Sequence, residues 1–397
     1  MRRTARWLTA VNTISAPRVN AQRARVDQVF DKMVRRAERA AEADASIAAE
    51  FVDSYRFLLR QVAKQGTLSM VGWQGFIDDL TRRMTNHLRV ENLIRENPEI
   101  AQQPIDRPIV VIGLPRTATT LTHKILIQPE GNRAPLMWEL MNTHRGDIDP
   151  KLRGKLIKDA QQMASLASKA SPVWDLIHPM NALQPEECVF ALPHGYQFIT
   201  RATMPAYRRW VDERDYTEDY GHLKRVLQVL QWRQPQKRWV LKTPFHLFNL
   251  DVLLKVFPDA TIVWMHRDPA TVMGSWCSLV ETGRALHHRT YDASKIGPEW
   301  LDIFGKGVAK ARAVRATALR ERFVDVPYHS LTADPSGYLP KLFARLGMEW
   351  TAKEAANLEQ VLARPGMRRS HEYHLSRYGV ELDDVEKAFG DYGRLGF

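Results

Sequence analysis

The sequence predicts an α/β protein in which a parallel sheet is covered by helices on both faces. Three observations lead to this fold class. From residue 108 onward, short apolar runs alternate with segments of helical spacing, as expected of buried parallel strands joined by helices. Before residue 105 the apolar spacing is helical almost throughout. The chain has 397 residues, of which 44% are hydrophobic, and this is ample for such a core.

The N-terminal part of the chain is predicted to be helical. Residues 22–104 place apolar side chains at helical spacing in stretches such as VDQVFDKMVRRAERAAEA and WQGFIDDLTRRM. The polar, proline-bearing stretch NPEIAQQPIDRP then forms a connector. We therefore expect residues 1–105 to form a helical extension packed on the core, and residues 106–397 to form one α/β domain.

The second part contains four predicted strands, which alternate with helical segments. The strands are IVVIG (109–113), RWVLK (238–242), TIVWMH (261–266) and RFVDVPY (322–328). The helical segments begin near Thr119 and at LFNLDVLLKVF (247–257), PATVMGSWCSLV (269–280) and SGYLPKLFARLG (336–347). Residues 151–235 are helical and too long for a simple crossover, so we expect an insertion that binds the substrate.

Positive charge is concentrated at the N-terminus. The formal net charge is +12, and the first 25 residues contain six arginines and no acid. They lack the apolar core of a secretory signal, and no stretch of the sequence approaches the roughly 18–20 apolar residues that span a bilayer. A basic helix on the fold or on a membrane surface fits this pattern, and an anionic partner is expected. Cys188 and Cys277 have neither paired nor metal-like spacing, which favours a reducing, cytoplasmic location.

The stretch GLPRTATT (113–120) after the first strand resembles the Walker pattern G-x-x-x-x-G-K-[ST]. Gly113 and Thr120 match, whereas Ala118 replaces the second glycine and Thr119 replaces the lysine. Backbone N–H groups at the turn and at the helix N-terminus can still hold an oxyanion. However, the lysine for a β/γ-phosphate is missing, and no strand ends in an acidic magnesium ligand. The loop suits a phosphate without a metal-bound triphosphate, and an ordinary strand–turn–helix junction is the alternative.

A second motif is VWMHRDPATVMGS, in which Arg267 follows a strand and Ser275 lies two turns into the next helix. Both motifs fall at the carboxyl edge of a doubly wound sheet, where ligands bind. An arginine there can bind a phosphate through two nitrogens. Taken alone, Arg267 beside Asp268 is more often an ion pair that only stabilises the fold. Two anion sites on neighbouring strand ends instead indicate a nucleotide that is phosphorylated at two places.

The motifs together resemble those of the sulfotransferase superfamily, in particular the bacterial-type branch related to protein-tyrosine sulfotransferases. They occur in the family order as GLPRTATT, VLKTPFHL, FPDATIVWMHRDPATVMGS and FVDVPYHSLTADP, and the resemblance covers about residues 105–385. It implies a P-loop-like fold with a parallel sheet of about five strands. It also implies transfer of a sulfuryl group from 3′-phosphoadenosine 5′-phosphosulfate (PAPS) to an acceptor hydroxyl. No metal is expected, because a transferring sulfuryl group carries less negative charge than a phosphoryl group.

The resemblance also implies roles for individual residues in nucleotide binding. The 5′-phosphosulfate would lie on the first loop, and the 3′-phosphate would lie on Arg267 and Ser275. For Tyr328 a buried structural role is the alternative, and for the C-terminal tail with Arg369 the alternative is a solvated basic turn. The expected nucleotide-binding residues are Pro115, Arg116, Thr117, Ala118, Thr119, Thr120, Arg267, Ser275, Tyr328 and Arg369.

Two residues are candidates for the general base. Cytosolic small-molecule sulfotransferases carry Lys-Thr-His at the end of the second predicted strand, whereas here KTPFH places His246 four residues after Lys242. In the tyrosylprotein branch a glutamate after the first helix is the base, and Glu139 in APLMWEL lies at a comparable position. We expect Glu139 to be the base and His246 its rival. Lys242 and Arg116 would neutralise the leaving phosphate.

The sequence leaves other functions open. His371 and His374 have helix-compatible spacing for a metal, but no third ligand is indicated, so no metal site is expected. One alternative function is a P-loop kinase-like phosphotransferase, against which the missing lysine and magnesium ligand argue. The other is a non-catalytic basic protein that binds nucleic acid or membranes. For the sulfotransferase we expect a small-molecule or lipid-like hydroxyl acceptor and no nucleic-acid partner, and the basic N-terminus is compatible with peripheral membrane contact.

Overall fold

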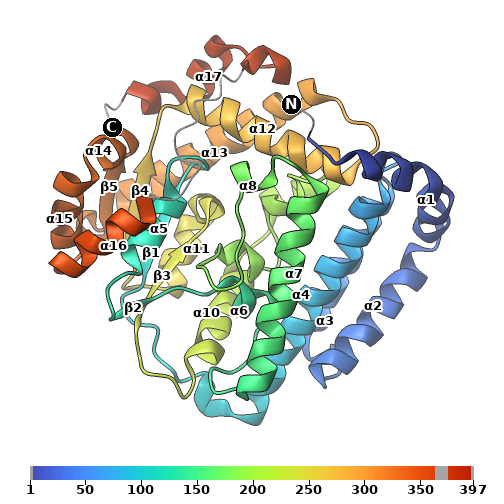
Figure 1. Cartoon of the computed structure of the whole chain (residues 1–397), viewed down its shortest axis with the longest axis horizontal. Coiled ribbons are helices and arrows are strands. Elements are labelled where there is room, and N and C mark those ends of the chain that lie inside the picture. The colour runs from blue at the N-terminus through green and yellow to red at the C-terminus, as the bar shows by residue number, and fades with distance from the viewer. Residues whose placement is uncertain (1–2, 363–373, 395–397) are drawn as a thin grey trace. The chain divides into compact units, whose positions relative to one another are not determined.

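Residues 3–362 and 374–394 are described by the computed structural model of this chain, whose elements are labelled in Figure 1. They fall into two units. The first consists of Met1–Pro104, Pro135–Gln236 and Val280–Tyr291, and the second of Ile105–Ala134, Lys237–Leu279 and Asp292–Phe397. The first boundary between the units lies between Pro104 and Ile105, close to the boundary that the sequence suggests. Residues 135–236 belong to the same unit as the N-terminal helices. The expected division of the chain at residue 105 stays a prediction about its domains.

The first unit is built from helices, in keeping with the helical spacing before residue 105. Its helix α4 begins after Ser69, whose hydroxyl accepts a hydrogen bond from the Gly72 N–H at 2.8 Å. Helix α2 packs on α4. The helices are α1 (Arg6–Ala24), α2 (Val26–Ala41), α3 (Ala49–Ala63), α4 (Met70–Glu96), α6 (Met137–Met141), α7 (Pro150–Ala170), α8 (Trp174–Ile177), α9 (Pro205–Glu213), α10 (Thr217–Gln231) and the last turns of α12 (Pro269–His287).

The second unit contains the sheet, and all of its strand pairs are parallel in the order β2-β3-β1-β4-β5. The strands are β1 (Ile109–Gly113), β2 (Asn132–Arg133), β3 (Arg238–Lys242), β4 (Thr261–His266) and β5 (Phe323–Pro327). Its helices are α5 (Thr119–Leu126), α11 (Leu250–Val256), the first turns of α12, α13 (Ile296–Thr317), α14 (Tyr328–Ala333), α15 (Pro335–Arg345), α16 (Ala352–Leu362) and α17 (Leu382–Phe389). The predicted α/β class and the five-stranded parallel sheet are confirmed.

The sheet's core explains why its strands are apolar throughout. Every residue of β1 is buried, as expected of a parallel strand covered on both faces. On one face, Val111, Val263 and Met265 pack with buried residues of α5, α15 and α16. Because β1 lies between β3 and β4, the carboxyl ends of these three strands are neighbours. The loop after β1 is thereby placed beside the residues that follow β3 and β4.

Two elements differ from the sequence expectation. The fifth strand, β2, has only two residues, too few for any periodic pattern to reveal it. The helix expected over 247–257 begins earlier, as a 3₁₀-helix over Pro244–Asn249, and continues as α11. Within the described ranges, every helix is too short or too polar to cross a bilayer.

Candidate functional site

The loop after β1 takes a conformation that few residues tolerate. Gly113 has a φ of 141°, and a Cβ there would lie 2.5 Å from the Met265 carbonyl oxygen, so glycine is required. Arg116 and Ala118 follow with φ of 69° and 68°, both in the left-handed region. Thr119 then begins α5. Left-handed residues in such turns direct N–H groups into a concave, anion-binding surface.

Ala118 occupies the position of the second Walker glycine and still adopts the left-handed conformation. An L-residue is destabilised by about 1–2 kcal/mol in this region, so the loop keeps its shape with local strain. Ala118 is also the N-cap of α5, and its methyl group has no atom that could cap the helix. The first N–H groups of α5 are therefore suited to an external anion, with support from the helix dipole.

The threonines of the loop divide between holding its shape and lining its surface. Thr117 is 1% exposed, and its hydroxyl donates a hydrogen bond to the Leu114 carbonyl oxygen at 2.7 Å. Pro115 is also buried, so these two residues shape the loop from within. Thr119 is buried at the first position of α5, whereas Thr120 is exposed. Of the loop's hydroxyls, that of Thr120 is the most accessible to a ligand.

The two anion-binding motifs of the sequence meet in the structure. The Arg116 Nε donates a hydrogen bond to the Ser275 hydroxyl at 3.1 Å, and an Arg267 guanidinium nitrogen donates to the Arg116 carbonyl oxygen at 2.7 Å. The Arg267 guanidinium also lies over the Tyr328 ring, 3.9 Å from its centre. Four of the predicted nucleotide-binding residues thus form one connected cluster. We call Arg116, Arg267, Ser275 and Tyr328 the arginine cluster.

The alternative ion pair between Arg267 and Asp268 is absent from the described part of the chain. The Asp268 carboxylate instead accepts hydrogen bonds from the Thr271 N–H at 2.8 Å and from the Thr271 hydroxyl at 2.6 Å. Asp268 therefore closes the first turn of α12. The guanidinium of Arg267 is left to the loop and to Tyr328.

Lys242 joins the loop from the neighbouring strand. It is the last residue of β3, is 2% exposed, and donates a hydrogen bond from Nζ to the Thr120 hydroxyl at 3.2 Å. His246 lies one turn further on, fully buried in the 3₁₀-helix that follows β3. Its backbone N–H donates to the Thr243 carbonyl oxygen at 3.2 Å. The structure therefore brings Lys242 to the loop, while the catalytic role of His246 stays a prediction.

Glu139, the expected base, belongs to the first unit. It lies in the first turn of α6 and is 8% exposed. Its carboxylate accepts a hydrogen bond from the Leu136 N–H at 2.8 Å, which closes the start of that helix. Its role as the base stays a prediction. Arg369 and His371 lie outside the described residues, and His374 is exposed.

A polar cluster that the sequence did not indicate lies beside β4 and β5. His266 Nε2 and an Asp325 oxygen are 2.8 Å apart, and Arg315 donates two hydrogen bonds of 2.6 Å to the same carboxylate. Burial alone raises the pKa of Asp325, but the hydrogen bonds from His266 and Arg315 lower it overall. A cavity of about 500 Å³ adjoins the cluster and is lined by Trp264, His266, Arg312, Arg315, Ala316, Ala318, Arg320, Asp325 and Tyr392.

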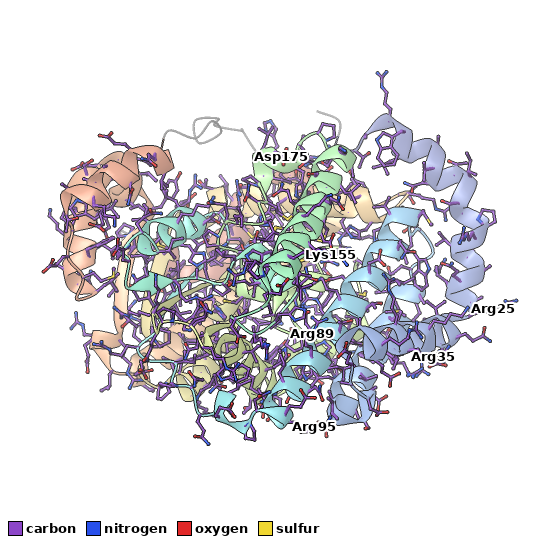
Figure 2. The ribbon with its side chains drawn as sticks, turned by 60° about the horizontal axis from the view of Figure 1, so that its bottom comes forward. Arg25, Arg35, Arg89, Arg95, Lys155 and Asp175 are labelled. Carbon is purple, nitrogen blue, oxygen red and sulfur yellow. The ribbon has the colours of Figure 1, made fainter. Side chains whose placement is uncertain are left out.

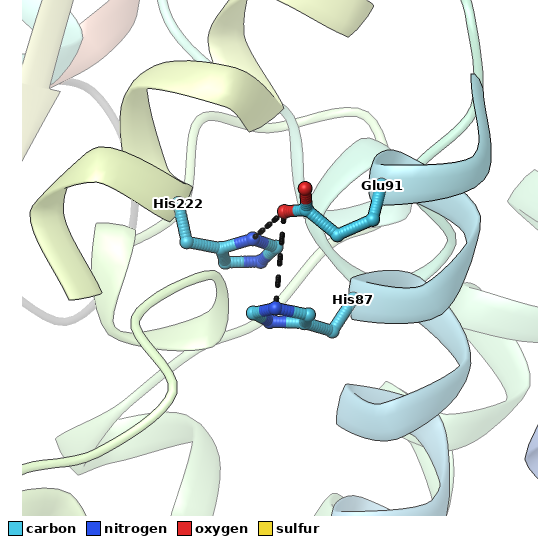
Figure 3. Close-up of side chains that lie close together, drawn as sticks. All are labelled: His87, Glu91 and His222. Carbon is cyan, nitrogen blue, oxygen red and sulfur yellow. Dashed lines mark ion pairs between the residues drawn. The ribbon is translucent and has the colours of Figure 1, made fainter. Parts of the chain in front are cut away.

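A second unpredicted cluster joins α4 and α10, as Figure 3 shows. One Glu91 oxygen lies 3.8 Å from His87 Nε2 and 3.7 Å from His222 Nδ1, a set of atoms with the chemistry of a metal site. The two imidazole rings are stacked, however, with centres 3.9 Å apart and planes at 15°. A nitrogen lone pair lies in its ring plane, so stacked rings cannot both direct one at a single ion. Arg225 Nε also donates to this Glu91 oxygen at 2.8 Å, which favours a structural cluster.

Comparisons with known proteins place the loop after β1 and its neighbouring strands within a known protein family. The model of a family described as the sulfotransferase family matches residues 108–352, from β1 to the start of α16. The chain is 27% identical over 285 residues to the omega-hydroxy-beta-dihydromenaquinone-9 sulfotransferases Stf3 of Mycobacterium bovis and Mycobacterium tuberculosis. This match covers 68% of the chain and 70% of each relative.

Two solved structures are similar over nearly the whole chain. Sulfotransferase STF1 from Mycobacterium tuberculosis H37Rv is 27% identical with a TM-score of 0.77, covering 92% of this chain and 98% of its own. Sulfotransferase STF9 from Mycobacterium avium is 26% identical with a TM-score of 0.79, covering 92% and 95%. Because the family model spans well over half of the chain and includes the loop, Lys242 and Arg267, the chain belongs to the sulfotransferase family and is an enzyme of that family.

Proposed function

We propose that the enzyme transfers a sulfuryl group from PAPS to the hydroxyl of a lipid-like acceptor. The observation that carries the proposal is the connected set of cations at the carboxyl ends of β1, β3 and β4. Lys242 reaches the loop from one side, and Arg267 reaches it from the other. A donor with phosphate groups at both the 5′ and the 3′ position matches two such neighbouring cationic sites.

The residues present fit the donor. The strained loop and the start of α5 suit the 5′-phosphosulfate. The methyl group of Ala118 does not cap this helix, so its first N–H groups are suited to an anion. In the arginine cluster, Arg267 and Ser275 would hold the 3′-phosphate, and Tyr328 would contact the nucleoside. Arg369 would add a further cation. When bound, the donor supplies an activated sulfuryl group and a phosphate leaving group.

Charge neutralisation at the transfer step would fall to Arg116 and Lys242. With this donor, the acceptor oxygen would bond to sulfur while the bond from sulfur to the bridging oxygen would break, and its electron pair would stay on the phosphate. Fixed cations beside that oxygen stabilise the developing charge without having to reorganise. With Thr119 in place of the Walker lysine, the cations come from Arg116 and from β3. This arrangement favours transfer without a metal.

The acceptor hydroxyl loses its proton in the same step, and a base must take it. We propose Glu139 for this role, with His246 as the competing assignment. A carboxylate oxygen within hydrogen-bond distance of the hydroxyl can accept the proton directly. The sequence resemblance to the branch related to protein-tyrosine sulfotransferases supports a glutamate at this position. His246 is 0% exposed and Glu139 is 8% exposed, so His246 is the less accessible of the two.

The nature of the acceptor is suggested by the relatives. The Stf3 proteins are named for an omega-hydroxy dihydromenaquinone, a lipid-like molecule with a hydroxyl group. We propose a small-molecule or lipid-like hydroxyl acceptor for this chain, without a nucleic-acid partner. The helices of residues 151–235 are the segment proposed to select it. A cytoplasmic enzyme that contacts membranes at their periphery would meet such an acceptor.

The donor assignment is tested by binding in the absence of metal. Adenosine 3′,5′-bisphosphate with EDTA should raise the melting temperature, because a ligand at ~100-fold excess over its Kd stabilises the folded state by roughly 2.7 kcal/mol. Adenosine 5′-phosphate serves as the matched control and should shift it less. Stabilisation by ATP–magnesium but not by the bisphosphate would replace this proposal with a kinase-like activity.

A further inference from the structure

Helix α1 carries apolar side chains on two of its sides, one buried and one exposed. Leu8 and Val19 are 2% and 1% exposed, so one side is packed into the first unit. Trp7, Val11 and Ile14 are 53%, 39% and 82% exposed. Their spacing of four and three residues places them on one face of the helix. This face therefore presents an aromatic ring and two branched side chains to solvent.

The same face carries positive charge without compensation. Arg18 continues the stripe of Trp7 and Ile14 at helical spacing. Arg6 is the first residue of α1 and Arg25 follows its last residue; all three arginines are exposed. The first acid of the chain is Asp27, which pairs with Arg60 at 2.8 Å. Across residues 3–362 and 374–394, no carboxylate pairs with Arg6, Arg18 or Arg25. Figure 2 shows Arg25 at the outer end of α1 and Arg35 on α2, both directed away from the helices.

The inner side of α1 is held by neighbouring elements, so the outer face is presented in a fixed orientation. The Ala5 N–H donates to the Ala170 carbonyl oxygen at 2.9 Å, and the Ser171 hydroxyl donates to the Arg3 carbonyl oxygen at 2.6 Å. Leu8 packs with Ala170 and Leu286. The helix is thus part of the folded unit rather than a loose arm.

We propose that the outer face of α1, defined as Trp7, Val11, Ile14 and Arg18 together with the flanking Arg6 and Arg25, docks on an anionic phospholipid surface. Trp favours the membrane interface, where its ring lies among the headgroups. The two branched side chains can enter the acyl boundary, and the arginines can bind headgroup phosphates. Each basic residue near an anionic leaflet adds attraction that falls off within a Debye length. Lying on the surface is the mode that fits, since α1 carries too many polar residues to span a bilayer.

The inference is argued from α1 alone, and only its link to catalysis rests on the proposed lipid-like acceptor. An acceptor with a long apolar part stays in the membrane. Docking through α1 would bring the enzyme to the leaflet that contains it. A surface that favours anionic lipid would then raise the rate on membrane-held acceptors and leave the rate on water-soluble hydroxyl acceptors unchanged.

The test is cosedimentation of the full-length protein with vesicles of phosphatidylcholine, with and without phosphatidylserine. Trp7→Ser with Ile14→Ser should weaken binding to the anionic vesicles at least about tenfold. Leu382→Ser is the matched control, because Leu382 is 60% exposed on α17, and it should bind like the wild type. Arg18→Glu with Arg25→Glu should remove the preference for phosphatidylserine, as should raising the salt concentration.

Several outcomes would overturn the proposal. One is equal binding of the wild type to both kinds of vesicle. Another is unchanged vesicle binding by the Trp7→Ser and Ile14→Ser double variant while its melting temperature is preserved. If this variant instead loses a self-association seen by light scattering, the face is a contact between copies of the chain. Sulfuryl transfer to a soluble hydroxyl is assayed separately. If that assay fails while vesicle binding responds as expected, the proposed function falls and the docking face stands.

Discussion

At the scale of single residues, Arg267 links the loop after β1 to Tyr328. One guanidinium nitrogen holds the loop through the Arg116 carbonyl oxygen, and the flat face of the group lies on the Tyr328 ring. These two contacts fix the guanidinium plane without using all five of its N–H groups. A fixed plane with donors to spare is what bidentate binding of a phosphate requires.

We therefore predict that Arg267→Ala weakens adenosine 3′,5′-bisphosphate far more than adenosine 5′-phosphate. The loss of a charge-assisted contact to the 3′-phosphate should cost on the order of 1.5–3 kcal/mol. Isothermal titration of both nucleotides measures the difference, with the exposed Arg345→Ala as a control. Equal losses for the two nucleotides would assign Arg267 to holding the loop only.

The identity of the base is the second question at this scale. Glu139→Gln is nearly isosteric and keeps an acceptor oxygen for the Leu136 N–H, so the start of α6 should be preserved. We expect it to reduce turnover by about 10²–10⁴ and to leave bisphosphate affinity unchanged. His246→Asn should retain more activity. Full activity of Glu139→Gln, together with an inactive His246→Asn that still binds the bisphosphate, would reverse the assignment.

At the scale of elements, the strand β1, the loop and α5 form the unit that makes the site. Only glycine fits at position 113. Ala118 adopts the left-handed conformation although it has a Cβ, and its backbone is therefore strained. Because the strain is local to the backbone, it can be measured as a stability difference.

We predict that Ala118→Gly stabilises the protein. Relief of about 1–2 kcal/mol of left-handed strain exceeds the roughly 0.5–1 kcal/mol lost to the greater freedom of glycine in the unfolded chain. Urea unfolding should show a gain of about 0.5–1 kcal/mol. Ala344→Gly, at an exposed position inside α15, should instead lose about 1 kcal/mol. A loss at both positions would show that the loop is not strained at Ala118.

The sequence predicts an element well when the element's own residues show a pattern, and poorly when the element depends on contacts with distant residues. The four longer strands are readable because burial on both faces makes their residues apolar in unbroken runs. The two residues of β2 form no pattern, since a strand that short is defined by its neighbour β3. The ends of β1 and β4 could be placed at one edge from the parallel order alone. The hydrogen bond from Arg116 to Ser275 could not, because it depends on the left-handed turn at Arg116.

At the scale of the whole molecule, buried histidines link stability to pH. His87, His194 and His222 are almost fully buried around Phe51, and burial lowers the pKa of each, that of His222 to about 3. The folded protein therefore keeps them neutral. As pH falls through about 6.5, the unfolded chain binds protons that the folded chain excludes. The stability they contribute is complete above this pH and is lost below it.

We predict that the free energy of unfolding falls between pH 7.5 and 5.5. Each such histidine lowers it by about 1.4 kcal/mol over this interval, and three lower it by roughly 4 kcal/mol. Urea unfolding at the two pH values measures the change. In His222→Gln the fall should shrink by about 1.4 kcal/mol, the share of one such histidine. An unfolding free energy equal at both pH values would contradict the prediction.

The ion pair between Arg3 and the fully buried Glu281 has a consequence for how the protein is handled. Shortening the N-terminus would remove one partner of this buried carboxylate, and breaking a buried pair from one side costs about 3–5 kcal/mol. Removal of Leu8 would also uncover Leu286 and Ala170. A trimmed expression product should therefore precipitate or be degraded in the host cell, for reasons unrelated to lipid binding. Crystallisation and solubility work should keep the first residues intact and change only the outward side chains of α1.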